Sequence, residues 1–160
     1  MVNERSLRMN RLKDGIVVVD DIVLDANTTL EDLQNIGIDK ATQRFHGNMF
    51  LELLFNKPIE SDGVTFEVSV RASQHDDSKV ILIDPKLSKP FRNAVDESRA
   101  KQEICEEWLK RNIDIPPTRD TDEGIFYEFD WGNLYSASVE HINFGHLEGC
   151  IQLTYGNVPM

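Results

Sequence analysis

The sequence predicts an α+β fold, in which a mainly antiparallel β-sheet carries one long and one short helix packed against it. Strand patterns follow one another in runs instead of alternating with helices, which is typical of this class. The clearest strand, residues 64–72 (VTFEVSVRA), alternates apolar and polar side chains as a half-buried antiparallel strand does. Two stretches, 28–37 and 93–112, instead repeat their apolar residues at helical spacing.

The N-terminal elements are expected to be a hairpin and the short helix. β-Branched runs at 15–19 and 22–24 flank Asp20 and Asp21, which suit a tight turn. In the following stretch, NTTLEDLQNIG, a threonine can cap a helix and acids occupy its first turn. Gly37 ends the pattern, so the predicted helix has about two turns.

From residue 41 onward the pattern predicts strands. Residues 49–55 (MFLELLF) are almost wholly apolar, which predicts a strand buried on both faces. A Ser-Asp-Gly turn leads into the alternating strand, and the polar turn QHDDS leads to a strand over 79–84.

The long helix ends before Pro116, because proline cannot continue it. Three antiparallel strands are predicted after it, over 125–131, 134–142 and 150–155, joined by a WGN turn and a longer NFGHLEG connection. The broad apolar face predicted for the helix consists of Ala94, Ala100, Ile104, Trp108 and Leu109. Its charged residues, Lys101 and Glu106 among them, are expected on the exposed, polar side.

The chain length of 160 residues fits one domain over 1–160, with 1–10 as a loosely ordered N-terminus. The opening MVNERSLRMN lacks the apolar run of a signal peptide, and no stretch reaches the roughly 20 apolar residues of a membrane span. We therefore expect a cytoplasmic protein. Its two cysteines, Cys105 and Cys150, are expected to be buried free thiols.

The net charge of −11 is concentrated in the C-terminal half. Residues 96–148 hold 13 acids against 5 bases, a balance of −8, whereas residues 1–95 hold 15 against 12. Such a field repels phosphate backbones and anionic membranes, which argues against nucleic acid or membrane as a partner. It attracts a basic protein. Solubility alone is the alternative explanation of the charge.

No motif in the sequence predicts catalysis, a cofactor or a metal site. His141 and His146 are five residues apart beside acids, but they lack the spacing of zinc ligands on a helix. His75 and the two aspartates after it are interpreted as a polar hairpin turn. Neither cysteine adjoins a histidine, and no glycine-rich nucleotide-binding motif occurs. The sequence favours a protein that is not an enzyme.

The stretch GIFYEFDWGNLYSASV holds the most informative pattern. Tyr127, Phe129 and Trp131 fall on one parity of the predicted strand, and Glu128 and Asp130 fall on the other. We expect the rings to point toward the core and the acids to point outward. Alternate residues on a strand face are about 6.6 Å apart, a spacing that also suits the carboxyl pair of a glycoside hydrolase. Three interpretations stay open: a catalytic pair, an acidic face for a basic partner, and a strand that exposes its polar side to water.

Seven acids are the candidate partner-binding residues. They belong to the long helix, to the loop after the prolines and to the last strands, where a rigid backbone suits the capture of a basic protein. They are Glu106, Asp120, Asp122, Glu123, Glu128, Asp130 and Glu140.

From residue 103 onward the chain resembles small bacterial proteins associated with toxin-immunity loci. The resemblance rests on EICEEWLKRNI, YEFDWGNLYSASVEH and GCIQLTY: a helix ending in Trp108 and Leu109, a Tyr-x-Phe-x-Trp-Gly strand, a second strand and a final Ile-x-Leu-x-Tyr strand. The chain departs from the group's pattern in its longer connection, which carries Glu140 in place of an aspartate. The resemblance implies an antiparallel α+β module that neutralises a cognate toxin by binding, and it carries over no catalytic residue.

The prediction is therefore a non-enzymatic, immunity-like protein that binds a basic toxin domain through an acidic surface, as a monomer or homodimer. One alternative is a small hydrolase in which Glu128 forms an acid–base pair with Asp130 or Glu140. The other is a homo-oligomeric structural subunit that pairs through an exposed edge of its last strand.

Overall fold

The structure, a computed structural model, describes residues 11–88, 90–137, 140–141, 145–146 and 150–156. Its helical elements are η1 (Leu12–Asp14), α2 (Leu30–Gln34) and α3 (Ala94–Asn112). Its strands are β1 (Val17–Val19), β2 (Ile22–Leu24), β3 (Ala41–His46), β4 (Phe50–Phe55), β5 (Ile59–Ser61), β6 (Val64–Ser73), β7 (Lys79–Pro85), β8 (Arg119–Thr121), β9 (Gly124–Phe129), β10 (Gly132–Ala137), β11 (Glu140–His141), β12 (Gly145–His146) and β13 (Ile151–Tyr155).

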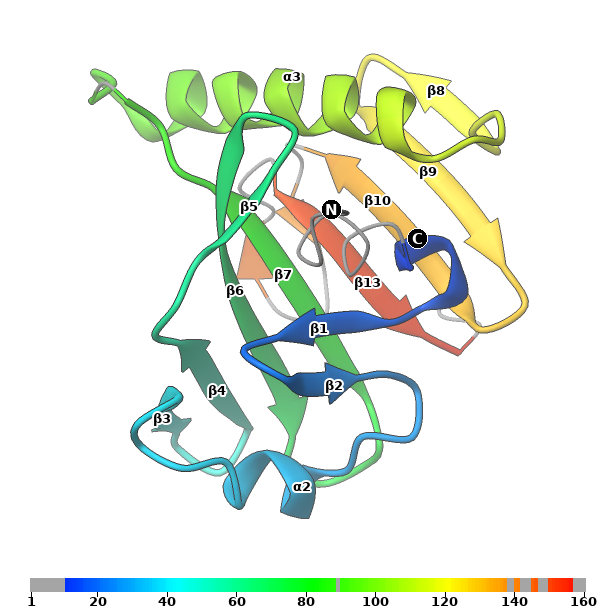
Figure 1. Ribbon diagram of the computed structural model, residues 1–160. Helices are drawn as coiled ribbons and strands as arrows, with labels where there is room; N and C mark the ends of the chain where they lie inside the picture. Colours follow the sequence, from blue (N-terminus) through cyan, green and yellow to red (C-terminus); the bar gives the residue numbers. More distant parts are fainter. Residues whose placement is uncertain (1–10, 89, 138–139, 142–144, 147–149, 157–160) are drawn as a thin grey trace, which may run out of the picture.

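Nine strands form one open antiparallel sheet in the order β3-β4-β6-β7-β13-β10-β9-β8, with β5 paired to β6 (Figure 1). The last strand, β13, lies between β7 and β10 and is hydrogen-bonded on both sides. The alternative in which the chain pairs with another copy through an exposed edge of this last strand is therefore wrong. It inserts between the two halves of the sheet, a placement that no local sequence pattern specifies. The edges of the sheet are β3 and β8.

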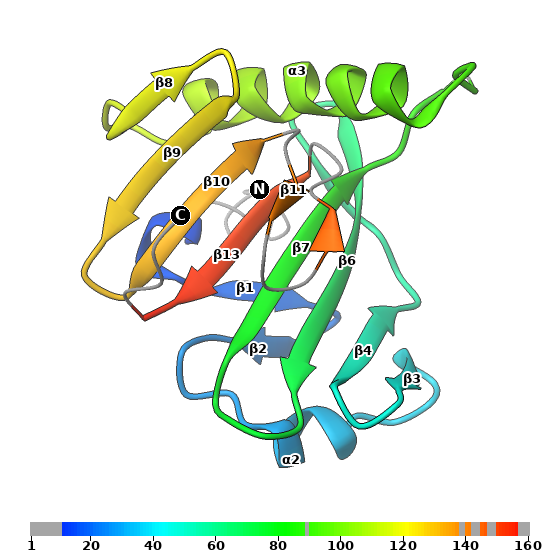
Figure 2. The same cartoon turned by 180° about the vertical axis from the view of Figure 1, so that it is seen from behind.

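One face of the sheet carries the main core. Leu33 of α2 and Trp108 of α3 belong to the same buried cluster as the strand residues, so both helices cover this face, as predicted. Figure 1 shows α3 crossing one end of the sheet and the β1–β2 hairpin crossing another part, and Figure 2 shows that hairpin from behind the sheet. One row of the core, each member at most 1% exposed, consists of Leu53, Val70, Ile81, Leu153, Leu134 and Tyr127.

The predicted N-terminal hairpin and short helix are both confirmed. Asp20 and Asp21 adopt positive φ angles of 47° and 67°, as a tight two-residue hairpin turn requires. At the start of α2, the Thr29 hydroxyl accepts a hydrogen bond from Asp32 N at 3.1 Å, and the Asp32 carboxylate accepts one from Thr29 N at 2.9 Å. This reciprocal cap satisfies two helix-terminal N–H groups, which explains why so short a helix forms there.

The long helix confirms its predicted length, and its predicted face is confirmed at Trp108 and Leu109 but does not account for Lys101. Cys105, Trp108 and Leu109 are fully buried, and Lys101, expected on the polar side, is buried as well. The Lys101 ammonium lies 3.0 Å from the Asp84 carboxylate at the end of β7. An ion pair with the sheet therefore turns a charged residue toward the core side, which a count of apolar residues alone does not anticipate.

Two expectations about strands are corrected. The strand 49–55 is not buried on both faces, because Leu54 of β4 is 45% exposed where the second face near the β3 edge is open. The short strands β5 (IES) and β8 (RDT) were not predicted, since neither contains the β-branched run that identified β1 and β2. The predicted strand 134–142 corresponds to β10, and β11 pairs separately with β12. Most of the NFGHLEG connection and the N-terminal residues 1–10 lie outside the described residues.

Candidate functional site

Three aromatic rings form a stacked row on the core side of β9 and the turn after it. The ring centroids of Tyr127 and Phe129 are 6.4 Å apart, and those of Phe129 and Trp131 are 5.3 Å apart, with nearly parallel planes in both pairs. Tyr127 is buried, and the other two rings are half-buried against the main core. The predicted inward orientation of these rings is confirmed.

Hydrogen bonds join the ring row and the neighbouring Tyr155 to the N-terminal part of the chain. Trp131 Nε1 donates a hydrogen bond to Lys13 O at 2.9 Å, and the Tyr155 hydroxyl donates one to Gly15 O at 2.8 Å. Gly15 has φ +74°, and a Cβ atom there would lie 2.7 Å from Trp131 Cδ2. Only glycine therefore fits between the ring and this turn, and the β9–β10 turn rests on a closely packed support.

The opposite face of β9 is not acidic throughout, which corrects part of the expected pattern. Phe126 is only 6% exposed and stacks on Tyr135 of β10, with ring centroids 5.8 Å apart. The Arg119 guanidinium lies over the Phe126 ring at 4.4 Å, in cation–π geometry. The polar face of this strand begins only at Glu128, which is exposed.

Five exposed carboxylates lie along the β8–β9 hairpin and the turn that follows it. We call this set the acidic rim: Asp120, Asp122, Glu123, Glu128 and Asp130. Since β8 is an edge strand, the rim occupies the border where the sheet has no further strand (Figure 1). Residues 119–130 contain these five acids and a single base, a local charge of −4. The structure thus brings five of the seven candidate acids onto one hairpin and its end.

Contacts of the rim and of the two remaining candidates refine the expectation. Asp120 lies 3.1 Å from the Lys110 ammonium, and this half-exposed pair joins α3 to β8. Glu106 was expected on the exposed side of the helix, but it is half-buried and accepts a hydrogen bond from Gln102 Nε2 at 3.2 Å. Glu140 lies in β11, and the position of its side chain is outside what the structure describes.

The catalytic and metal interpretations gain no supporting geometry. Glu128 and Asp130 are both exposed, so burial does not separate an acid from a base in the way a carboxylate pair needs. His141 and His146 lie in β11 and β12, with Glu140 opposite His146. Within the described ranges, no three His, Cys, Asp or Glu residues are grouped so that they could hold a metal ion.

The remaining sequence interpretations are confirmed by local contacts. The QHDDS stretch is a hairpin turn, in which Ser73 Oγ accepts a hydrogen bond from His75 N at 3.1 Å and Asp76 Oδ1 accepts one from Ser78 N at 2.8 Å. Cys105 and Cys150 are both buried and are not joined in a disulfide, and burial raises the pKa of the Cys105 thiol well above its usual range.

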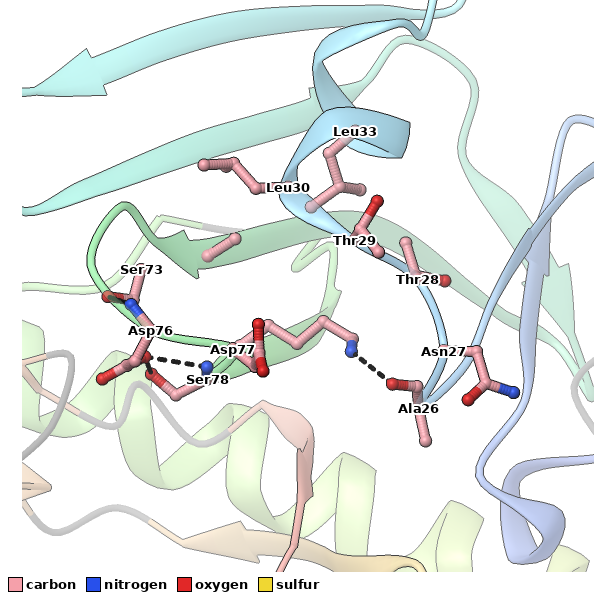
Figure 3. Close-up of a pocket in the computed structure, with 12 residues that line it drawn as sticks. Ala26, Asn27, Thr28, Thr29, Leu30, Leu33, Ser73, Asp76, Asp77 and Ser78 are labelled. Atoms are coloured by element: carbon pink, nitrogen blue, oxygen red, sulfur yellow. Dashed lines mark hydrogen bonds between the residues drawn. The ribbon is translucent and has the colours of Figure 1, made fainter.

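A pocket of about 230 Å³ lies between the loop before α2 and the β6–β7 turn, and the sequence did not point to it. Figure 3 shows Thr28 and Asp77 among the polar side chains around it. Lys79 is buried there: its ammonium donates to Ala26 O at 3.1 Å and lies 4.7 Å from the Tyr155 ring centroid. Desolvation lowers the pKa of Lys79. Because the ammonium is already engaged, we assign it the role of joining the N-terminal loop to the sheet.

A second pocket, of about 670 Å³, lies between α3 and the start of β6. Its lining is mixed, with Val64, Leu87, Phe91 and Ile104 beside Glu103. No acid of the rim lines either of these two pockets.

The fold and the site together define an α+β protein with an open antiparallel sheet and an acidic border along one edge. No family model, curated protein or solved structure matches the chain. Among the described residues, no helix is both long enough and apolar enough to cross a membrane.

Proposed function

We propose that this chain is a non-enzymatic protein-binding module that captures a basic protein through the acidic rim. The observation that carries the proposal is the combination of exposed carboxylates with packed support. Glu128 and Asp130 alternate with Tyr127, Phe129 and Trp131, of which Tyr127 is buried in the core and the other two pack against it. A surface that is already ordered loses little conformational entropy on binding, so more of the contact energy remains as affinity.

Electrostatics favour a cationic partner over a neutral or anionic one. The rim has a local charge of −4 within a chain of net charge −11. Such a field accelerates the encounter with a basic protein and opposes nucleic acid. The effect acts within a Debye length of about 8–10 Å, so it weakens as salt is raised.

The finer proposal is an immunity-like role, in which the partner is a basic toxin domain. It rests on the resemblance of the C-terminal stretch to proteins of toxin-immunity loci. A toxin that acts on nucleic acid needs lysine and arginine side chains to bind the phosphate backbone. The carboxylates of the rim would compete with the phosphates for these side chains. Binding would then block access of the substrate to the toxin.

The test uses the protein encoded by the adjacent gene. We expect it to be a chain with a compact basic domain that binds this protein, with an affinity that falls as salt rises from about 50 to about 300 mM. An affinity that is unchanged over this range would contradict the electrostatic part of the proposal. An adjacent metabolic enzyme with no affinity for this chain would contradict the immunity-like role.

Two variants of equal net charge separate the rim from the overall charge. The rim variant is Asp122→Asn, Glu123→Gln and Glu128→Gln. The control variant neutralises three exposed acids elsewhere, namely Glu31→Gln, Asp39→Asn and Glu60→Gln. We expect the rim variant to lower the association rate at least roughly five-fold and the control to change it by less than about two-fold. Equal effects would mean that only the total charge matters.

A further inference from the structure

The other edge of the sheet, β3, has main-chain groups available for an additional strand. Just before β3, Asn56 N donates a hydrogen bond to Lys40 O at 2.9 Å. Hydrogen-bonded pairs alternate along an antiparallel ladder, so in the register of β3 and β4 the even-numbered residues of β3 form the hydrogen bonds to β4. The odd-numbered residues therefore direct their N–H and C=O groups away from β4. The N–H of Ala41 is already used by Gly37 O at 3.1 Å.

Two residues, Gln43 and Phe45, keep these outward groups. Hydrogen bonds from their main chain to anything beyond β4 are absent among the described residues. The spacing of the two residues is that of one repeat along a strand, so an added strand could form four hydrogen bonds with them. This geometry is what β-augmentation uses, in which a partner's extended segment joins the edge of a sheet.

The side chains at this edge are unlike those at β8. The β8 edge has only three residues and is followed by acids, features that prevent strand pairing. β3 has six residues and no acid. Its Phe45 ring is 52% exposed on the core side of the sheet, Arg44 is exposed on the opposite side, and Met49 at the hairpin tip is 71% exposed.

A second copy of the chain is a poor occupant of this edge. In one antiparallel register, Gln43 of each copy forms main-chain hydrogen bonds with Phe45 of the other copy. This register places the Arg44 residues of the two copies directly opposite each other. Like charges directly opposite each other on neighbouring strands are destabilising. A register shifted toward Ala41 meets the Gly37–Ala41 turn, and one shifted the other way meets Gly47, where φ is +58° and the strand has ended.

We propose that the β3 edge binds an extended segment of a partner protein with a carboxylate opposite Arg44 and an apolar side chain beside Phe45. The carboxylate would neutralise the exposed guanidinium, and the apolar side chain would cover the exposed ring. This inference concerns a surface at the opposite border of the sheet from the acidic rim and does not depend on the function proposed for the rim.

The experiment is an NMR titration of the ¹⁵N-labelled protein with two synthetic peptides. The probe is acetyl-Thr-Val-Glu-Val-Thr-amide, and the comparison peptide has lysine in place of the glutamate. We expect the glutamate peptide to shift the amide resonances of Gln43 and Phe45 and to bind roughly two- to five-fold more tightly than the lysine peptide. In the Arg44→Glu variant we expect the order of the two peptides to reverse.

A matched pair of variants isolates the main-chain contribution. Phe45→Ala keeps the outward N–H, whereas Phe45→Pro removes it without removing a hydrogen bond between β3 and β4. We expect the proline variant to bind the glutamate peptide roughly five-fold more weakly than the alanine variant. Amide spectra of both variants verify that the remainder of the fold is intact.

Three outcomes would overturn the inference. One is the absence of shifts at Gln43 and Phe45 with either peptide. Another is equal affinity for the two peptides. The last is a dimer, detected by sedimentation, that Phe45→Pro dissociates, since this would assign the edge to a second copy. The rim variant with three neutralised acids should bind the glutamate peptide as the unmodified protein does, which keeps this test separate from that of the rim.

Discussion

The contact between Gly15 and Trp131 gives the sharpest prediction about stability. In Gly15→Ala, the new Cβ would lie 2.7 Å from Trp131 Cδ2, and the backbone would have to keep a φ of +74°. The left-handed conformation costs an alanine about 1–2 kcal/mol. If the ring moves aside, the hydrogen bond from Trp131 Nε1 to Lys13 O is lost, at about 0.5–1.5 kcal/mol. We expect a total loss of about 1.5–3.5 kcal/mol in the free energy of unfolding.

A double-mutant cycle with Trp131→Ala separates the two contributions. Without the ring there is neither a steric conflict nor a hydrogen bond to lose, so Gly15→Ala should then cost only the backbone part, about 1–2 kcal/mol. The expected coupling energy is about 0.5–1.5 kcal/mol. The assay is urea unfolding at pH 7 monitored by circular dichroism. The four proteins are compared with one common value for the slope of the free energy of unfolding against urea concentration.

A clear result would refute this reasoning. If Gly15→Ala costs the same in both backgrounds, the ring does not lie against this turn. The ring row would then lose its anchor to the N-terminal part of the chain, and the rigid support inferred for the acidic rim would lose its main contact.

Three further predictions concern buried groups. Lys101→Met should lower the free energy of unfolding by about 1–3 kcal/mol, because it removes the ammonium group that lies against the partly buried Asp84 carboxylate. Lys13→Met, which removes an exposed ion pair, should lower it by less than about 1 kcal/mol. Chemical unfolding measures both changes. Burial raises the pKa of Tyr135, so above about pH 10 its hydroxyl loses a proton in the unfolded chain and keeps it in the folded chain. The free energy of unfolding should therefore fall as the pH rises above about 10. Tyr135→Phe should flatten that fall in unfolding curves recorded between about pH 8 and 11. The two buried thiols, including Cys105, should react with an aromatic disulfide reagent only after unfolding, and rapid reaction of the native protein would contradict their burial.

Local elements of this fold were predictable because their signals are local. The Asp20–Asp21 turn, the Thr29 cap and the alternation over 64–72 each depend on a few neighbouring residues. The inward rings of β9 follow from the same principle, since alternate side chains of a strand point to opposite faces.

What the sequence could not reveal depends on partners distant along the chain. β13 inserts between β7 and β10, and Lys101 is buried because its partner Asp84 lies in another element. Phe126 has the same strand parity as Glu128, yet it is buried because Tyr135 of the neighbouring strand stacks on it. For the same reason the open edge of β3 was invisible, since an edge is defined by the order of the strands.

The candidate site was predicted in composition more than in position. Charge counting found the acidic half of the chain, and strand parity placed Glu128 outward. It did not reveal that Asp120 lies in an edge strand beside Lys110, nor that Glu106 is half-buried beside Gln102. These details depend on how α3 crosses the sheet.

The most direct test of the acidic rim as the surface for a basic partner is amide chemical-shift mapping with decalysine at low salt. We expect the shifts to concentrate in residues 119–130 and to fade as the salt concentration is raised to about 0.3 M. Shifts spread evenly over exposed acids across the molecule, including Glu31 and Glu60, would contradict the account.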